Sequence, residues 1–327
     1  MRAVGLYEFG GPEVLQAIEL PDPHAGPGEI RVRVRAAAVN PSDTLLRSGA
    51  HASALAGVPG PYVPGMDVAG VVDEIGPGTQ TDLSIGDPVM AMLLPVTPAP
   101  DGSLQNSGGG YAEYVVRPAN WIVRAPVGIS HEAAATLPMN ALTAMLALDQ
   151  LNLAPGSTLA VVGAAGALGS YLMQMARQAG LIVIGDAAPA DEELVRGSGA
   201  IDIVARGSDV VERIRARYPD GVDAIADVAL FGSRLFDAVR DGGTLVRFRQ
   251  SDEPGGYQAD STRGITVRTP FVPEYAGRTD KLDEIRRLAE SGVLIPRVAK
   301  TLPAAEAHDA HRRLAAGGVR GRLVLTF

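Results

Sequence analysis

The sequence predicts an α/β protein that combines a β-rich domain with a doubly wound parallel sheet. Three observations lead to this prediction. Residues 30–39, IRVRVRAAAV, alternate apolar and basic side chains, which is typical of a strand with one exposed face. From Thr158 onward, short apolar runs alternate with helical segments, as they do in βαβ units. A glycine-rich turn at residues 163–169 directly follows the first of these apolar runs.

Composition excludes several classes of function. The 327 residues, 46% hydrophobic and 20% charged, are enough to bury two cores. The 37 acidic residues against 29 basic ones give a net charge of -8, which argues against nucleic acid as the main partner. The chain has no cysteine. It therefore has no disulfide, no thiol nucleophile and no cysteine-ligated zinc or iron–sulfur cluster.

The start of the chain and its most apolar stretch bear on location. Residues 1–11 include Arg2 and Glu8 and lack the continuous apolar segment of a secretory signal, so we expect a cytoplasmic protein. The most apolar stretch, residues 89–96, is far shorter than the roughly 18 apolar residues of a membrane span. We therefore expect no membrane partner.

The elements follow in order from local patterns. Three more β-prone runs, residues 68–75, 88–94 and 111–116, precede a capping Ser130 and a helical region interrupted at Pro138. Residues 94–110 are expected to form a long surface loop. The alternating region predicts strands 158–162, 181–184, 201–204, 224–228 and 244–248, with helices ending at 177 and spanning 192–197, 209–218 and 235–240. Two helices, 281–292 and 304–316, and a strand from 321 close the chain.

The glycine-rich turn, GAAGALG, predicts a dinucleotide site. A tight turn between a strand and a helix lets the backbone approach a pyrophosphate, whose charge then lies at the positive end of the helix. A turn of this kind can also serve strand-to-helix packing alone. Its place inside a longer alternating βα region favours the dinucleotide.

The choice between NADH and NADPH depends on residues after the second strand of this region. Asp186 stands close to the position of a ribose-binding carboxylate, and Asp191, Glu192 and Glu193 follow it. These carboxylates favour NADH if they point toward the cofactor, because they repel a phosphate. They are equally explained as the acidic first turn of a helix. Arg206, after the third strand, could reach a phosphate and favour NADPH.

Two spaced pairs have structural interpretations. His308 and His311 share a helix face, and without a third ligand we interpret them as residues of an exposed helix rather than a metal site. Asp43 and Arg47 stand at i,i+4 spacing, which predicts an ion pair that shapes a pocket wall.

Several motifs in order show a family resemblance. They are AAAVNPSD (36–43), PGMDVAGVV (64–72), GGYAEYV (109–115), ALTA (141–144), the glycine turn and GRLVL (321–325). With them the chain resembles zinc-independent medium-chain dehydrogenases/reductases of the quinone oxidoreductase branch. This implies a GroES-like catalytic domain from residues 1–122 and 275–327, a Rossmann domain from 123–274, and a cleft that holds nicotinamide and substrate.

The resemblance also implies the chemistry. Zinc-dependent members hold the metal with a cysteine where this chain has Asn40 and a histidine where it has Met66. We therefore expect metal-free hydride transfer to a small-molecule quinone or α,β-unsaturated carbonyl (enone). NADPH is the cofactor expected from the family, and NADH stays open because of Asp186. Relatives of this kind are often dimers, which implies a homodimer.

Site residues are carried over from the resemblance by position. The catalytic candidates are Asn40, Asp43, Thr143 and Tyr62. Many relatives have a tyrosine where this chain has Leu45, so Tyr62 or a water would have to supply the proton. Tyr62, in GPYVPG, is better explained as a residue that packs a turn. The cofactor-binding candidates are Asn40, Thr143, Ala165, Gly166, Ala167, Leu168, Asp186, Arg206, Val228, Ala229, Phe248 and Arg249.

Two other functions remain compatible with the sequence. One is a dedicated enoyl or ketone reductase that acts on a single metabolite, and the other is a non-catalytic nucleotide-binding relative. Leu45 and the acidic segment after Asp186 favour the non-catalytic relative, whereas the intact glycine turn with Asn40 and Thr143 favours activity.

Overall fold

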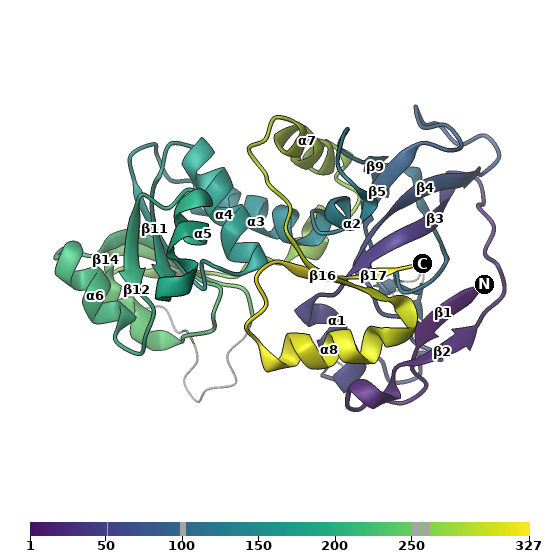
Figure 1. Cartoon of the computed structure of the whole chain (residues 1–327), viewed down its shortest axis with the longest axis horizontal. Coiled ribbons are helices and arrows are strands. Elements are labelled where there is room, and N and C mark those ends of the chain that lie inside the picture. Colours follow the sequence, from purple (N-terminus) through teal and green to yellow (C-terminus); the bar gives the residue numbers. More distant parts are fainter. Residues whose placement is uncertain (51, 99–102, 250–256, 258–261) are drawn as a thin grey trace. The chain divides into compact units, whose positions relative to one another are not determined.

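A computed structural model describes residues 1–327 except 51, 99–102, 250–256 and 258–261 (Figure 1). The chain divides into two compact units. Unit 1 comprises Met1–Met139, Tyr275–Gly292 and Pro296–Phe327, and unit 2 comprises Asn140–Glu274 and Val293–Ile295. The predicted α/β class, with a β-rich unit and a doubly wound parallel sheet, is confirmed. The first change of unit falls after Met139, whereas the sequence places a domain boundary after residue 122.

Unit 1 is built on a seven-stranded sheet in the order β16-β17-β3-β4-β5-β9, with β8 also paired to β3. Its long strand β3 alternates buried and outward-facing residues before it ends in three buried alanines, as the period-two pattern predicts. The strands are β3 (Glu29–Ala38), β4 (Asp67–Ile75), β5 (Pro88–Met92), β8 (Tyr114–Pro118), β9 (Ile122–Arg124), β16 (Val298–Pro303) and β17 (Arg322–Thr326).

Two small antiparallel sheets complete the strands of this unit. One pairs β1 (Arg2–Gly5) with β2 (Gln16–Glu19), and the other pairs β6 (Val96–Pro98) with β7 (Leu104–Asn106). The second pair corrects the expectation that residues 94–110 form an irregular loop. The physical reason is that three residues are too few for the alternation of apolar and polar side chains in a strand to be recognised in the sequence.

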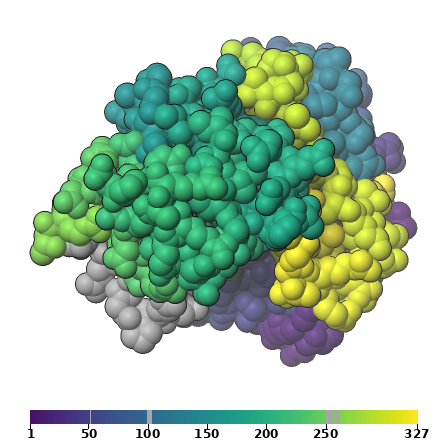
Figure 2. Space-filling model, turned by 60° about the vertical axis from the view of Figure 1, so that its left-hand side comes forward, coloured from purple at the N-terminus to yellow at the C-terminus, as the bar shows by residue number. Residues whose placement is uncertain are grey.

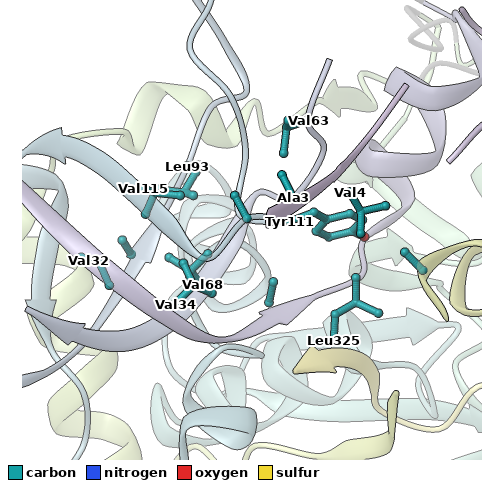
Figure 3. Close-up of a cluster of buried hydrophobic side chains, with 14 of the residues drawn as sticks. Ala3, Val4, Val32, Val34, Val63, Val68, Leu93, Tyr111, Val115 and Leu325 are labelled. Atoms are coloured by element: carbon teal, nitrogen blue, oxygen red, sulfur yellow. The ribbon is translucent and has the colours of Figure 1, made fainter. Parts of the chain in front are cut away.

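Helices pack around the unit 1 sheet. They are α1 (Pro41–Ser48), α2 (His131–Ala134), α7 (Thr279–Glu290) and α8 (Ala307–Ala316), with 3-10 turns η1 (Pro12–Val14), η2 (Ala119–Trp121) and η6 (Ala304–Glu306). The 3-10 turn η5 (Val272–Tyr275) lies where the chain passes from unit 2 to unit 1. Ser130 caps α2 as predicted, since its hydroxyl accepts the amide hydrogen of Ala133. The core gathers side chains from the sheet and from α8, and Tyr111 lies inside it (Figure 3).

Unit 2 is a six-stranded parallel sheet in the order β12-β11-β10-β13-β14-β15. The strands are β10 (Thr158–Val162), β11 (Ile182–Ala187), β12 (Asp202–Ala205), β13 (Val222–Asp227), β14 (Val239–Arg247) and β15 (Thr266–Arg268). This is the strand order of dinucleotide-binding Rossmann folds, with the switch point between β10 and β13.

The chain passes from unit 1 into unit 2 within α3 (Pro138–Leu151). The strands of unit 2 are connected by α4 (Ala167–Gln178), η3 (Pro189–Asp191), α5 (Glu192–Gly197), α6 (Val210–Arg217) and η4 (Ser233–Ala238). Because parallel crossovers are right-handed, the reversal at the switch point places α6 on the opposite face from α4 and α5. On the side facing the viewer in Figure 2, residues of this unit form one continuous packed surface.

One predicted helix of unit 2 is wrong. Residues 235–240 form the second half of the 3-10 turn η4 and the first residues of β14. The crossover is short, because η4 ends at Ala238 and the strand begins at the next residue. Among the described residues, no helix combines the length and the apolar character needed to cross a membrane.

Candidate functional site

The glycine turn connects β10 to α4 as predicted. Gly163 has a φ of 95°, and a Cβ placed on it would lie 2.9 Å from the amide nitrogen of Ala229. Only glycine allows this conformation and this approach. The amides of Val228 and Ala229 both donate to the carbonyl of Val162, at 2.9 and 3.1 Å. The turn and the segment after β13, two of the predicted cofactor-binding regions, therefore lie side by side.

The same turn fits a dinucleotide pyrophosphate. Gly166 is the N-cap of α4, a helix of 12 residues, and a Cβ on Gly166 would lie 3.3 Å from the carbonyl oxygen of Gly163. Ala165, Ala167 and Leu168 complete this end of the helix, where the helix dipole is positive. Small side chains at a helix N-terminus beside the switch point form an anion cradle.

Asp186 is directed at this turn. Its Oδ1 accepts hydrogen bonds from the amides of Gly163 at 2.6 Å and Ala164 at 2.9 Å, and its Oδ2 lies 2.9 Å from Nε of Arg206. The carboxylate is buried, whereas 37% of the Arg206 side chain is exposed. The charge of Asp186 is thus paired with that of Arg206, so neither charge acts on a cofactor independently of the other.

The other acidic residues of that segment lie in the first turn of a helix. Glu192 and Glu193 begin α5 and are exposed, and Asp191 just before them is buried. This agrees with the interpretation of these residues as the acidic first turn of a helix, in which negative charge stabilises the helix N-terminus.

The remaining cofactor candidates of unit 2 also have defined places. Thr143 lies in α3 and is buried, and Phe248 and Arg249 directly follow β14. Sequence reasoning missed Asp227, the last residue of β13. Its carboxylate accepts the amides of Phe231 and Gly232, both at 2.9 Å, and so fixes the loop after that strand.

In unit 1, two aspartates and Asn40 form a fully buried cluster. Asn40 donates its backbone amide to Oδ2 of Asp43 and its Nδ2 to Oδ2 of Asp67, both at 2.8 Å. Oδ1 of Asp43 accepts the amide of Gly65 at 2.9 Å, and Oδ1 of Asp67 accepts that of Met139 at 2.6 Å. Asn40 is thus held from both sides by carboxylates.

Burial changes the acidity of both carboxyl groups. It raises the pKa of Asp43 to about 6 and that of Asp67 to about 7. The hydrogen bonds they accept and the positive charge of Arg322 lower the pKa of each and offset part of this effect. Asp67 therefore titrates near neutral pH.

The cluster continues to Tyr111 and His311. The Tyr111 hydroxyl lies 3.5 Å from Oδ2 of Asp43 and 3.0 Å from Nε2 of His311. Burial lowers the pKa of His311 to about 3, so the imidazole is neutral. The expectation that His311 belongs to an exposed helix face is wrong, because α8 turns it into the core. No group of three or more metal-ligating side chains occurs in the described part of the chain.

The structure decides two further expectations about unit 1, one on an ion pair and one on Tyr62. The predicted ion pair between Asp43 and Arg47 does not form, because Asp43 instead accepts backbone amides. Tyr62 is buried, stacks on Phe9 with ring centroids 5.2 Å apart, and donates its hydroxyl hydrogen to the carbonyl of Val58 at 2.6 Å. A hydroxyl engaged in this way packs a turn and has no proton available for a substrate.

Three residues of this cluster, Asp67, Tyr111 and His311, were not predicted from the sequence to be site residues. The signal for Asp67 was present, since it is a carboxylate inside the apolar stretch 63–72. A charge in such a stretch needs buried partners. Tyr111 and His311 are 200 residues apart along the chain, and no local pattern predicts their contact.

The fold defines a class, proteins that combine a β-rich unit with a Rossmann unit. Two family descriptions match the chain, "Alcohol dehydrogenase GroES-like domain" over residues 26–127 and "Zinc-binding dehydrogenase" over residues 199–325. A quinone oxidoreductase of Pseudomonas aeruginosa is 30% identical over 99% of both chains. A 2-haloacrylate reductase of Burkholderia is 28% identical over 99% of this chain and 98% of that protein.

Longer relatives and solved structures agree. The polyketide synthase GfsB of Streptomyces halstedii is 32% identical over 91% of this chain, which spans only 5% of that protein. An NAD-dependent alcohol dehydrogenase structure matches with a TM-score of 0.85 at 30% identity, covering 100% of both chains. A mycobacterial protein complexed with NADPH matches with a TM-score of 0.84 at 27% identity, also over 100% of both chains.

The chain therefore belongs to the medium-chain dehydrogenase/reductase family, in its quinone oxidoreductase branch. These relatives support an NAD(P)H-dependent oxidoreductase of that family.

Proposed function

We propose that this protein reduces a quinone or an α,β-unsaturated carbonyl with NADPH, without a metal ion. The observation that carries the proposal is the glycine turn at the switch point of a Rossmann sheet, in a chain similar to a quinone oxidoreductase and a 2-haloacrylate reductase. Both relatives are named for acceptors with an activated double bond, which is where a hydride adds.

The residues of unit 2 would hold the cofactor, which when bound supplies a hydride. The backbone of residues 165–168 binds the pyrophosphate, and Asp186 keeps the turn rigid by holding two of its amides. Arg206 supports NADPH over NADH. It uses Nε for Asp186, and its exposed guanidinium has further N–H groups to bind an additional phosphate.

The residues of unit 1 act by position. The carboxylate of Asp67 fixes the amide orientation of Asn40, which stands with Met66 where zinc-dependent relatives have ligands. Negative charge that develops on the acceptor oxygen is stabilised by hydrogen-bond donors. Because the Tyr62 hydroxyl is bonded to Val58 and Leu45 cannot donate, the oxygen takes its proton from water.

A dedicated reductase of one metabolite is the second candidate, and the similarity of this chain to part of the polyketide synthase GfsB supports it. The homodimeric state and the cytoplasmic location expected from the sequence stay predictions.

The test measures oxidation of NADPH and NADH by the purified protein, with 1,4-benzoquinone and with a simple enone as acceptors. Gly166→Asp is the disabling variant, because its carboxylate would face the pyrophosphate. Aspartate suits the N-cap of α4, so this variant should fold. Gly197→Asp is the matched control, since it adds the same charge where a Cβ meets nothing within 4 Å.

We expect turnover in the wild type and in Gly197→Asp, and its loss in Gly166→Asp. Binding of NADPH without turnover on either acceptor would contradict the general reductase and favour the dedicated one. Equal turnover in all three proteins would show that the glycine turn does not bind the cofactor.

A further inference from the structure

A buried arginine in unit 1 has no acceptor for part of its guanidinium. Arg47 lies in the last turn of α1 and is 8% exposed. Its Nε and Nη1 are buried and have no hydrogen-bond partner in the described part of the chain. Glu13, the carboxylate whose charge reaches it, is exposed and does not pair with it. The guanidinium therefore has two N–H donors inside the unit for which the described residues supply no acceptor.

The second polar group without a partner belongs to His311, which is completely buried. Its Nε2 lies beside the Tyr111 hydroxyl, and its Nδ1 has no partner among the described residues. Arg47 lies one helical turn after Asp43 in α1, and the Tyr111 hydroxyl lies 3.5 Å from Oδ2 of Asp43 and 3.0 Å from Nε2 of His311. Because residues at i and i+4 share a helix face, Arg47 faces the same part of the core as these contacts. The charge of Arg47 also contributes to the lowered pKa of His311. Among the described residues, three buried nitrogen atoms of Arg47 and His311 thus lack partners.

These atoms have one ligand chemistry in common. Nε and Nη1 of Arg47 can only donate, and they carry a full charge at every pH at which the protein is folded. Hydrogen bonds from a guanidinium to an anion are about twice as strong as those between neutral groups, and they also compensate the charge, which a water molecule does not. We propose that Arg47 and Nδ1 of His311 bind a small oxyanion, of the phosphate or carboxylate class.

Binding of the anion sets the direction of the hydrogen bonds that the Tyr111 hydroxyl makes with His311 and Asp43. A neutral imidazole carries one N–H, so an anion that accepts from Nδ1 leaves Nε2 to accept from Tyr111. Without the anion, Nε2 donates to the Tyr111 oxygen and the tyrosine hydroxyl turns to Asp43, 3.5 Å away. The anion therefore selects the tautomer of His311 and removes a donor from Asp43. This inference does not depend on the proposed reductase activity.

The experiment records long-range 1H–15N spectra of the full chain labelled in its five histidines, during titration with sodium phosphate. Sodium chloride at matched ionic strength is the control, and sodium acetate tests the carboxylate class. We expect one histidine to change from the Nε2–H to the Nδ1–H tautomer with phosphate, and His311→Gln identifies it by removing the signal. Arg47→Gln should abolish the response, and Glu13→Gln, the matched control, should keep it.

Arg47→Lys covers the case in which Arg47→Gln fails to fold. It keeps the charge but replaces the planar fork, so the response should need at least about tenfold more phosphate. The proposal is overturned if millimolar phosphate and acetate leave all histidine tautomers unchanged, or if the arginine variant that folds responds as the wild type does. A response confined to Glu13→Gln would also overturn it, because Glu13 would then be the partner of Arg47.

Discussion

Nε of Arg206 lies 2.9 Å from Oδ2 of Asp186, across two neighbouring parallel strands of the Rossmann sheet. The other oxygen of the same carboxylate holds the amides of Gly163 and Ala164. The glycine turn, which we propose binds the pyrophosphate, and Arg206, which we propose binds the additional phosphate of NADPH, are therefore joined through one buried side chain.

Removal of the Arg206 charge should change cofactor preference. A charged hydrogen bond contributes about 1.5–3 kcal/mol, so we expect Arg206→Leu to raise the KM for NADPH by roughly 10- to 100-fold and to change that for NADH much less. Arg206→Lys keeps the charge and should keep the preference. Steady-state kinetics with both cofactors checks this. An equal loss for NADPH and NADH would assign Arg206 to the support of the turn alone.

Loss of the Asp186 carboxylate should impair both cofactors alike. Asp186→Ala leaves two backbone amides and Arg206 without their acceptor, at a cost of about 1–3 kcal/mol for each buried group. We expect a lower thermal midpoint in calorimetry and a similar rise in KM for NADPH and NADH. Asp186→Asn, which retains one carbonyl oxygen, should lose less. A variant with wild-type stability would mean that the turn holds its shape without the carboxylate.

The buried carboxyl groups make stability depend on pH. The pKa of Asp67 is about 7 in the folded protein and near 4 in an unfolded chain, so the folded state retains a proton that the unfolded state has released. Stability therefore falls as pH rises through 7. Asp43 acts in the same direction up to about pH 6, whereas His311, with a folded pKa of about 3, makes stability rise up to about pH 6.5.

Above pH 6 the contribution of Asp67 should dominate. We expect the free energy of unfolding to fall by about 1 kcal/mol between pH 6 and 8 in the wild type. In Asp67→Asn this fall should disappear, because the rise due to His311 then outweighs the fall due to Asp43. Urea titrations followed by Trp121, the single tryptophan and a residue of unit 1, measure this change. The same slope in both proteins would place the titration on another group.

Arg117 should stabilise the segment that carries the β6–β7 hairpin. Its guanidinium is buried and donates to four main-chain carbonyls, those of Leu94, Ser107, Gly108 and Val116. Arg117→Met removes every one of these donors, so we expect a loss of more than about 2 kcal/mol in the same tryptophan-detected urea titration.

Two further variants separate this interpretation from a general effect of charge. Arg117→Lys should recover only part of the stability, because a single ammonium cannot reproduce the fork. Arg124→Met, at an exposed arginine paired with Asp82, should lose much less. Equal losses at both arginines would contradict a special role of Arg117.

Local patterns in the sequence determined most of the elements. The alternation in β3, the cap at Ser130, the boundaries of α5 and the glycine turn were all predicted from neighbouring residues. Side-chain periodicity and helix capping act over a few neighbouring residues, so the local sequence is sufficient to predict where these elements form and end. The order of the βα units likewise follows from the regular spacing of apolar runs.

Only the tertiary structure decided what the polar side chains contact. Successive strand residues face opposite sides of a sheet, so the exact place of Asp186 on β11 directs its carboxylate at the turn. His311 is buried because α8 packs the helix face that carries it against the core. Asp43 does not pair with Arg47, because its two carboxylate oxygens accept hydrogen bonds from the amides of Asn40 and Gly65. Hydrogen bonds between residues distant in sequence depend on packing, which no local pattern contains.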